Sequence, residues 1–297
     1  MSAWRSSFHG GHSGQFCDHA KGSLREMIEA AIEKGIKTYG LSEHSPRFSE
    51  DQIFSEEKEN GYDVDKLIAT FLSYIEEAFL LQKEYKDRIN IFVGFETEYI
   101  SEDYLEKMKN LRREGAFDYI IGSVHHVNEI CIDAKPEWTQ KAIESCGGIE
   151  NFAINYYQSI ARLVMSLKPQ IVGHIDLIKK CLDEKIALDS QPIKNQMCET
   201  LKVISDNNCA LDLNVYPFRK GKSEPYPAPW IVQMAHEMNI PFAFGDDSHS
   251  PDTVGVGLDE GRDYLLSLGV EEVQIFEWDE AEGCSKKKLR LKNVSLN

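Results

Sequence analysis

Short apolar runs rich in β-branched and aromatic residues alternate with helical segments along most of this sequence. Runs of this length are typical of buried strands, whereas the segments between them are long enough for helices. Strand and helix alternate about seven times, which is the pattern of a parallel α/β fold. So many βα units in one chain favour a closed barrel over an open sheet. The runs predicted as strands are residues 37–42, 89–98, 117–124, 170–176, 209–215 and 241–246, with a late run at 272–278.

The helical segments follow the apolar runs, and the first of them carries signals at both ends. Ser23 is followed three residues later by Glu26, which is the spacing of a capping box, and Gly35 is suited to the end of a helix. No repeat or linker interrupts the alternation, so we expect one domain over residues 1–297. The basic run at residues 286–290 is interpreted as a solvated tail. The segments predicted as helices are residues 23–34, 64–86, 103–113, 149–167, 193–207, 228–237 and 258–267.

The composition narrows the class of protein. Of the 297 residues, 42% are hydrophobic, which is enough for a sizeable core. The sequence contains neither an apolar stretch of membrane-spanning length nor an apolar signal-peptide core, so we expect a cytoplasmic protein with no membrane partner. The net charge of −16 argues against a nucleic-acid partner. A small anionic substrate is still compatible with it, because bound cations can reverse the sign of charge within a pocket.

Histidines and carboxylates close almost every apolar run. Because the carboxyl ends of barrel strands converge on one face, we expect these side chains to share one basin. Imidazole and carboxylate are ligands of zinc, iron and manganese, and there are too many of them for one four-coordinate ion. We therefore expect two or three divalent ions that share a bridging carboxylate. The residues that close the runs are His9, His12, His44, Glu96, Glu98, His125, His126, His174, Asp176, Asp246, Asp247 and His249.

Neighbouring residues on a strand point to opposite faces, which separates some of these candidates. His125 and His126 cannot both face the basin easily, and we favour His125 as the ligand. The same alternation favours Glu96 as the bridging carboxylate, but Glu98 shares its face and is a rival.

In their order along the chain, these residues resemble the motifs of the PHP (polymerase and histidinol phosphatase) superfamily, and within it the histidinol-phosphate phosphatase branch. The resemblance extends from about residue 9 to residue 257. Any one motif is unspecific, whereas the ordered set is highly specific. The segments that resemble metal motifs are residues 12–19, 42–47, 94–98, 122–125, 173–176 and 245–251, and those closer to the phosphatase branch are residues 214–220 and 224–227.

The resemblance implies a distorted (β/α)7 TIM-like barrel that holds up to three metal ions, with zinc, iron or manganese as the metal. It implies three sets of ligands, one ion being held by each set. The sets are His9, His12, Glu96 and Asp247 for the first ion, Glu96, His125 and His174 for the second, and His19, His44 and His249 for the third.

The opening motif departs from the family pattern, in which one residue separates the two histidines. Here Gly10 and Gly11 lie between His9 and His12. Regular alternation would turn His9 away from the site, whereas a bulge at the two glycines would turn it back. His12 is therefore the safer of the two ligands.

The implied reaction is hydrolysis of a phosphate monoester, most specifically of L-histidinol phosphate to L-histidinol and phosphate in histidine biosynthesis. Asp247 and Asp176 are candidate proton carriers, although Asp176 could equally orient His174. The candidates for substrate binding are Arg47 and Arg219, which offer a fork of donors to phosphate, together with Lys220 and Tyr226. For Lys220, surface charge is an equally good interpretation.

Three other interpretations stay open at this point. The same basin could serve another small phosphomonoester or a nucleotide. A nuclease of the polymerase-associated kind uses similar chemistry, but the acidic composition counts against it. The altered first motif also leaves room for a metal-binding relative that has lost catalysis. The sequence leaves the oligomeric state undetermined.

Overall fold

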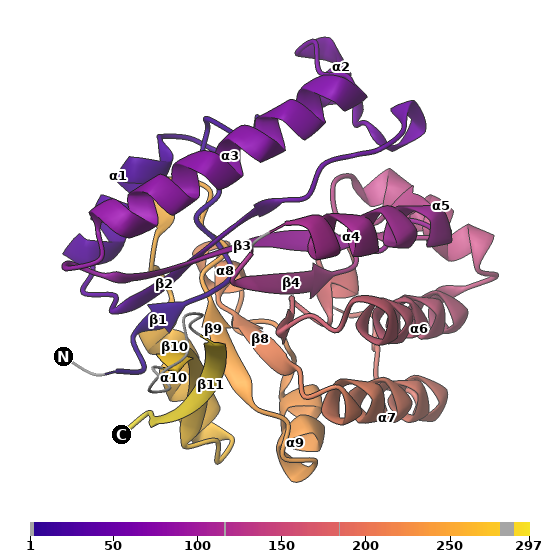
Figure 1. Cartoon of the computed structure of the whole chain (residues 1–297). Coiled ribbons are helices and arrows are strands. Elements are labelled where there is room, and N and C mark those ends of the chain that lie inside the picture. Colours follow the sequence, from indigo (N-terminus) through magenta and orange to yellow (C-terminus); the bar gives the residue numbers. More distant parts are fainter. Residues whose placement is uncertain (1–2, 116, 184, 280–287) are drawn as a thin grey trace.

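Seven parallel strands form the central sheet of the protein (Figure 1). The computed structural model describes residues 3–115, 117–183, 185–279 and 288–297. The strands are ordered β1-β2-β3-β4-β7-β8-β9, so each is hydrogen-bonded to the next one of the sheet along the chain. They are β1 (Ser6–Ser7), β2 (Thr38–His44), β3 (Asn90–Glu98), β4 (Tyr119–Ser123), β7 (Ile171–Val172), β8 (Ala210–Asn214) and β9 (Phe242–Gly245).

The sheet curves until its two edges meet. The backbone N–H of Phe8 donates to the carbonyl of Phe244 at 2.8 Å, and His9 forms a parallel bridge with Gly245. The sheet is therefore a nearly closed barrel, and the predicted distorted (β/α)7 fold is confirmed. The run at residues 170–176 is a strand only at Ile171–Val172, because a turn in which Leu177 donates to the carbonyl of His174 leads the chain out of the sheet.

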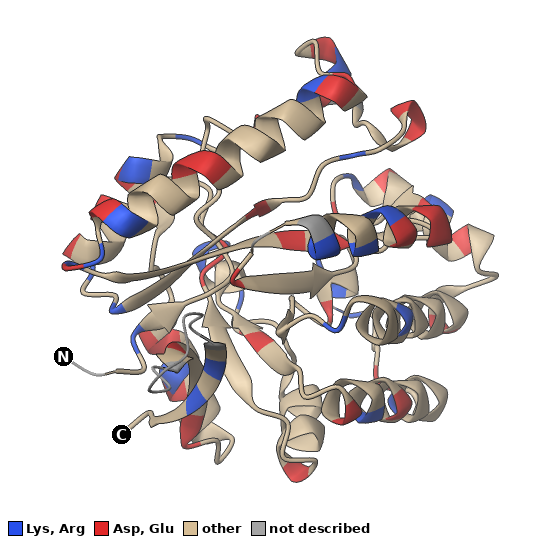
Figure 2. Cartoon of the chain, viewed as in Figure 1, with Lys and Arg blue, Asp and Glu red and all other residues tan. Residues whose placement is uncertain are grey.

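Helices connect the strands and surround the barrel (Figure 1), with acidic and basic residues mixed along them (Figure 2). Each of the predicted helices is present, and their ends lie within two residues of the predicted ends. Ser23 and Glu26 form the predicted capping box, and Gly35 has a φ of +74° just after the helix. The predicted helices are α1 (Leu24–Glu33), α3 (Val64–Glu84), α4 (Glu102–Glu114), α6 (Ile149–Leu167), α7 (Gln191–Asp206), α9 (Pro229–Glu237) and α10 (Leu258–Ser267).

Several short elements that the sequence did not indicate lie in the connections. One of them, the β5–β6 hairpin, follows β4 and begins with His126. Among the described residues, no helix combines the length and hydropathy that a bilayer span requires. The additional elements are α2 (Ser55–Glu59), α5 (Pro136–Ser145), α8 (Tyr216–Arg219), β5 (His126–Val127), β6 (Ile130–Cys131) and the 3₁₀ turns η1 (Glu50–Gln52), η2 (Leu177–Lys179) and η3 (Pro251–Thr253).

The late run at residues 272–278 is a strand, β10 (Glu272–Asp279), but it lies outside the barrel sheet and pairs antiparallel with β11 (Lys288–Ser295). The prediction of a solvated tail at residues 286–290 is wrong for Lys288–Arg290, which begin β11, while residues 286–287 lie outside the described residues. The physical reason is packing, because Phe276 of the hairpin contacts Phe8 inside the barrel at 4.4 Å between ring centroids. The single-domain organisation of residues 1–297 stays a prediction.

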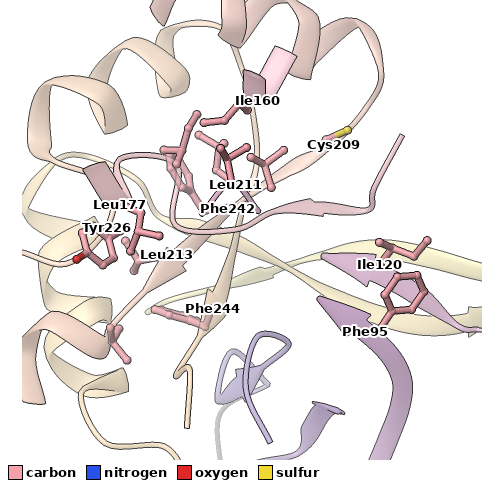
Figure 3. Packing of buried hydrophobic residues seen from close by; sticks show 14 of the residues in the cluster. Phe95, Ile120, Ile160, Leu177, Cys209, Leu211, Leu213, Tyr226, Phe242 and Phe244 are labelled. Atoms are coloured by element: carbon pink, nitrogen blue, oxygen red, sulfur yellow. The ribbon is translucent and has the colours of Figure 1, made fainter. Parts of the chain in front are cut away.

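Strand alternation determines which side chains enter the barrel. Leu211 and Leu213 of β8 pack in the apolar layer between sheet and helices, as do Phe242 and Phe244 of β9 (Figure 3). The residue between the two leucines, Asp212, therefore points into the barrel. The same parity directs one set of side chains of each strand inward, and the inner set becomes polar toward the carboxyl ends of the strands.

Candidate metal centre

Glu96 lies near the end of β3 and is surrounded by four imidazole rings. Its Oε1 is 3.1 Å from His9 Nε2, 3.2 Å from His174 Nε2 and 3.5 Å from His125 Nε2. Its Oε2 is 3.0 Å from His44 Nδ1. Each ring comes from a different strand or from the residues just after it, and Glu96 is only 3% exposed. The predicted convergence of these side chains at the carboxyl end of the barrel is therefore present in the structure.

A second group of rings adjoins the first and includes residues of the loop after β9. The ring of His12 stacks on those of His44 and His249, at centroid distances of 4.3 Å and 4.2 Å. His19 lies 5.0 Å from His249 between ring centroids, and Asp247 Oδ1 is 3.8 Å from His12 Nε2. All nine residues predicted as ligands are thus brought together, and their role as ligands stays a prediction.

Several subsets of these side chains place their ligand atoms within 4.8 Å of one another. One subset contains the third ligand set that the family resemblance implies, with the thiol of Cys17 beside it. Another contains three of the four members of the first set. The subsets include Cys17–His19–His44–His249, His9–His12–Glu96, His9–His174–Asp247 and His12–Asp247–His249.

The donor atoms of this cluster fit metal ions. His9 Nε2, His12 Nε2, His44 Nε2, His174 Nδ1 and Glu96 Oε1 are buried, and none has a hydrogen-bond partner among the described residues. A buried polar atom without a partner costs about 1–3 kcal/mol, so five in one place are unfavourable unless a further group binds them. Imidazole nitrogens and carboxylate oxygens are the donors that divalent zinc, iron and manganese accept.

Two buried carboxylates that the sequence analysis did not select orient the rings. Asp212 Oδ2 is 2.7 Å from His9 Nδ1, and Glu43 Oε1 is 3.2 Å from His12 Nδ1. Asp212 also accepts a hydrogen bond from the backbone N–H of His174 at 3.2 Å. A carboxylate at Nδ1 fixes the tautomer that leaves the Nε2 lone pair facing the site. For Asp212, the only signal in the sequence was a charged residue inside the apolar run at residues 209–215.

The glycine pair turns His9 into the site. Gly10 has a φ of +144° and Gly11 a φ of +75°, which are conformations that other residues rarely adopt. Regular alternation, which would have turned His9 away, therefore fails at this point. The alternative interpretation, that the two glycines redirect the ring, is the one that the structure supports.

Without a bound cation, the pKa values of the imidazoles in the site are shifted in opposite directions. Burial disfavours the charged ring of His9, but the carboxylates of Glu96 and Asp212 hold its pKa well above the ordinary value. Burial also opposes the charged form of His125, yet Glu96 and Glu98 raise its pKa to about 9. Burial and the charge of His12 together lower the pKa of His44 to about 4. Binding of a cation would therefore displace protons from some rings but not from all of them.

The alternation argument at residues 125 and 126 agrees with the geometry. His125 Nε2 faces Glu96, whereas His126 Nδ1 lies 2.9 Å from Glu98 Oε2. Glu98, the rival to Glu96, also forms an ion pair with Arg47 at 2.9 Å. Arg47 is buried, and its Nε has no partner among the described residues.

Two of the other predicted substrate-binding residues, Arg219 and the exposed Lys220, lie at the end of α8. Both terminal nitrogens of Arg219 donate to backbone carbonyls, those of Asp246 and Asp247, so this side chain holds the loop that carries Asp247. Lys220 lies 5.3 Å from the ring of Tyr216.

Tyr226 is buried, with its ring 6.2 Å from that of His174. Asp176 Oδ2 is 2.8 Å from Lys179 Nζ and accepts a hydrogen bond from the backbone N–H of Ala228. The roles of these residues in binding and proton transfer stay predictions.

A cavity of about 690 Å³ opens beside the cluster. His44, Glu96 and His125 line it on the side of the candidate metal centre, and Arg47 and Thr97 also face it. Its volume is that of a site for a small organic molecule.

Comparisons with a family model and with individual relatives agree on one family. The PHP domain model matches residues 10–215. A Schizosaccharomyces pombe protein named "Probable histidinol-phosphatase" is 33% identical over 290 residues, which are 95% of this chain and 94% of the relative. The "Histidinol-phosphatase" of Bacillus subtilis is 31% identical over 254 residues, which are 81% of this chain and 92% of the relative.

Two solved structures share the fold. A protein from Listeria monocytogenes superposes with a TM-score of 0.74 at 25% identity, covering 86% of this chain and 99% of that chain. The histidinol phosphate phosphatase of Lactococcus lactis superposes with a TM-score of 0.71 at 19% identity, covering 92% of this chain and 97% of that chain. The latter was solved in complex with zinc, L-histidinol and phosphate.

Proposed function

The chain belongs to the PHP domain family, and we propose that it is a metal-dependent histidinol-phosphatase, which hydrolyses L-histidinol phosphate to L-histidinol and phosphate. The observation that carries the proposal is the set of four imidazoles around Glu96 beside the cavity. The names of relatives that align over most of their length support the choice of substrate. On this proposal the enzyme acts in histidine biosynthesis and is cytoplasmic.

We assign two or three divalent ions to the cluster, with zinc, iron or manganese as the metal. Metal ions held there would supply Lewis acidity and positive charge for hydrolysis of a phosphate ester. The proposed ligands are those of the sequence analysis, and the distances among their donor atoms are compatible with shared ions. The ligands are His9, His12, His19, His44, Glu96, His125, His174, Asp247 and His249.

The side chains of this protein supply orientation and proton transfer. Asp212 and Glu43 hold the rings of His9 and His12 with Nε2 facing the site. Burial alone would favour the neutral form of Asp247, but His9 and His249 hold its pKa far below the ordinary value. An ionised Asp247 can accept a proton from an attacking water, which favours the role of base for this residue.

We assign the phosphate to the wall of the cavity that Arg47 lines. Its buried Nε has no partner among the described residues and can donate to a phosphate oxygen. Arg219, Lys220 and Tyr226 are proposed to complete the substrate site. Asp176 is proposed as a second proton carrier, its Oδ1 being buried and without a partner in the described part of the chain.

The test is a comparison of substrates on the purified, metal-loaded protein. We expect kcat/KM for L-histidinol phosphate to exceed that for glucose 6-phosphate and AMP by at least about a hundredfold, because a site that hydrogen-bonds its substrate discriminates strongly against ligands without the matching groups. A better substrate among the others would contradict the proposed specificity. No turnover of any phosphomonoester by metal-loaded protein would indicate a non-catalytic relative.

A further inference from the structure

The cavity has a second side, which the mechanism above does not use. It is formed by the connection between β2 and α3, which contributes Phe54, Glu57 and Tyr62, and by Trp138 of α5. This side is aromatic and carries the carboxylate of Glu57. The guanidinium of Arg47 lies 4.9 Å from the ring of Phe54, and Lys135 lines the cavity beside Trp138, whereas the candidate ligands of the metal ions line the other side. The cavity therefore offers the candidate metal centre and a separate carboxylate to one bound molecule.

Glu57 differs from the other carboxylates that line the cavity. Asp133 pairs with Lys180 at 2.9 Å, Glu98 pairs with Arg47, and Asp18 lies 3.4 Å from His19. Glu43 and Glu96 contact the imidazoles described above. Glu57 accepts a hydrogen bond from the backbone N–H of Phe54 at 2.9 Å, and within the described residues no cationic side chain lies at ion-pair distance from it.

The surroundings of Glu57 make a cationic ligand favourable. Its side chain is partly buried, and burial raises the pKa of its carboxyl despite the nearby Arg47. A partly desolvated carboxylate without a counter-ion gains most from a charged donor that the ligand brings with it. Arg47 and Thr97 line the same cavity, and each has a buried polar atom, Nε and Oγ1, without a hydrogen-bond partner among the described residues.

We propose that Glu57 binds the positively charged group of the substrate and so selects phosphomonoesters that carry an ammonium or imidazolium group over neutral and sugar phosphates. The proposal rests on the proposed function, since L-histidinol phosphate has a phosphate at one end and an amine and an imidazole at the other. Phosphate between the candidate metal centre and Arg47 would leave the cationic end of the molecule to reach Glu57.

The experiment compares Glu57→Gln with Glu59→Gln, an exposed position in the same helix α2. Glu57→Gln keeps the shape and removes the charge. We expect it to raise KM for L-histidinol phosphate about tenfold or more, the range for loss of one charge-assisted hydrogen bond. The kinetic constants for p-nitrophenyl phosphate, which has no cationic group, should stay within about twofold, and Glu59→Gln should change neither substrate.

Two analogues identify the group that Glu57 binds. 3-(Imidazol-4-yl)propyl phosphate lacks the amine, and phenylalaninol phosphate lacks the imidazole. The analogue without the recognised group should be hydrolysed equally by the wild type and by Glu57→Gln. Unchanged KM for L-histidinol phosphate, or an equal loss for p-nitrophenyl phosphate, would overturn the proposal. Failure of the proposed function has a different signature, because the wild type would then hydrolyse p-nitrophenyl phosphate and not L-histidinol phosphate.

Discussion

Asp212→Asn tests the orienting carboxylate without changing any candidate ligand. Asp212 is 1% exposed, and its Oδ2 receives hydrogen bonds from His9 Nδ1 at 2.7 Å, from Asn214 Nδ2 at 3.1 Å and from the backbone of His174 at 3.2 Å. Asparagine keeps the size and one acceptor oxygen but removes the charge. The ring of His9 then loses the charged partner that increases the basicity of Nε2.

The expected magnitude follows from the contacts that are lost. A carboxylate that orients a metal-binding histidine typically contributes 10- to 100-fold in metal affinity or activity, roughly 1.4–2.8 kcal/mol. The fold should survive, because Leu211 and Leu213 on either side remain packed in the core. We therefore expect a weaker metal site in a folded protein.

The assay is a titration of chelator-stripped protein with zinc and with manganese, together with kcat/KM for L-histidinol phosphate at each loading. Asp206→Asn, at an exposed position on α7, is the matched control. Metal affinity and activity of Asp212→Asn within about twofold of the control would refute the reasoning that Asp212 orients His9 toward a cation.

Four further predictions follow from contacts of the same site. Glu96→Gln removes the charge shared by four imidazoles, and elemental analysis should show loss of at least one metal ion per chain; full occupancy with normal activity would exclude Glu96 as the bridging ligand. Because Glu96 and Glu98 raise the pKa of His125 from 6.5 to about 9 against the effect of burial, its charged form stabilises the chelated protein below pH 6.5, and this stabilisation is lost as the pH rises through about 9. The Tm of chelated protein should therefore fall over this window while metal affinity rises, and a rising Tm would contradict the assignment. Gly10→Ala places a Cβ against Asp246 at a φ of +144°, and denaturant unfolding should show a loss of at least about 1–3 kcal/mol, whereas unchanged stability would argue against this backbone conformation. Arg219→Ala frees the carbonyls of Asp246 and Asp247, so metal content should fall together with kcat/KM; a fall in kcat/KM at unchanged metal content would instead indicate that Arg219 binds only phosphate.

The barrel and its helices could be predicted because their signals are local. A helix such as Ile149–Leu167 has a long apolar face. The capping-box residues Ser23 and Glu26 mark the start of helix α1. Strand β11 could not be predicted in the same way. Its Leu289 and Leu291 lie within and just after a basic run. They are partly buried only because the hairpin packs against Phe8 and its neighbours inside the barrel, a contact that depends on the complete fold.

One rule was enough to predict most residues of the candidate site. Polar residues at the carboxyl ends of parallel strands must meet, and this rule selected Glu96 and the rings around it. It could not select Asp212, because the role of a single carboxylate within an apolar run depends on its partner across the barrel, which the sequence does not identify. The hydrogen bonds of Arg219 to the loop after β9 are likewise a property of tertiary structure.

The measurement that tests the central claim most directly is release of phosphate from L-histidinol phosphate before chelation, after chelation and after return of metal. We predict that activity disappears when elemental analysis shows the protein to be free of metal. Zinc, iron or manganese should then restore it at two or three equivalents per chain. Full activity in protein that is demonstrably free of metal would contradict the assignment of the histidine cluster as a catalytic metal centre.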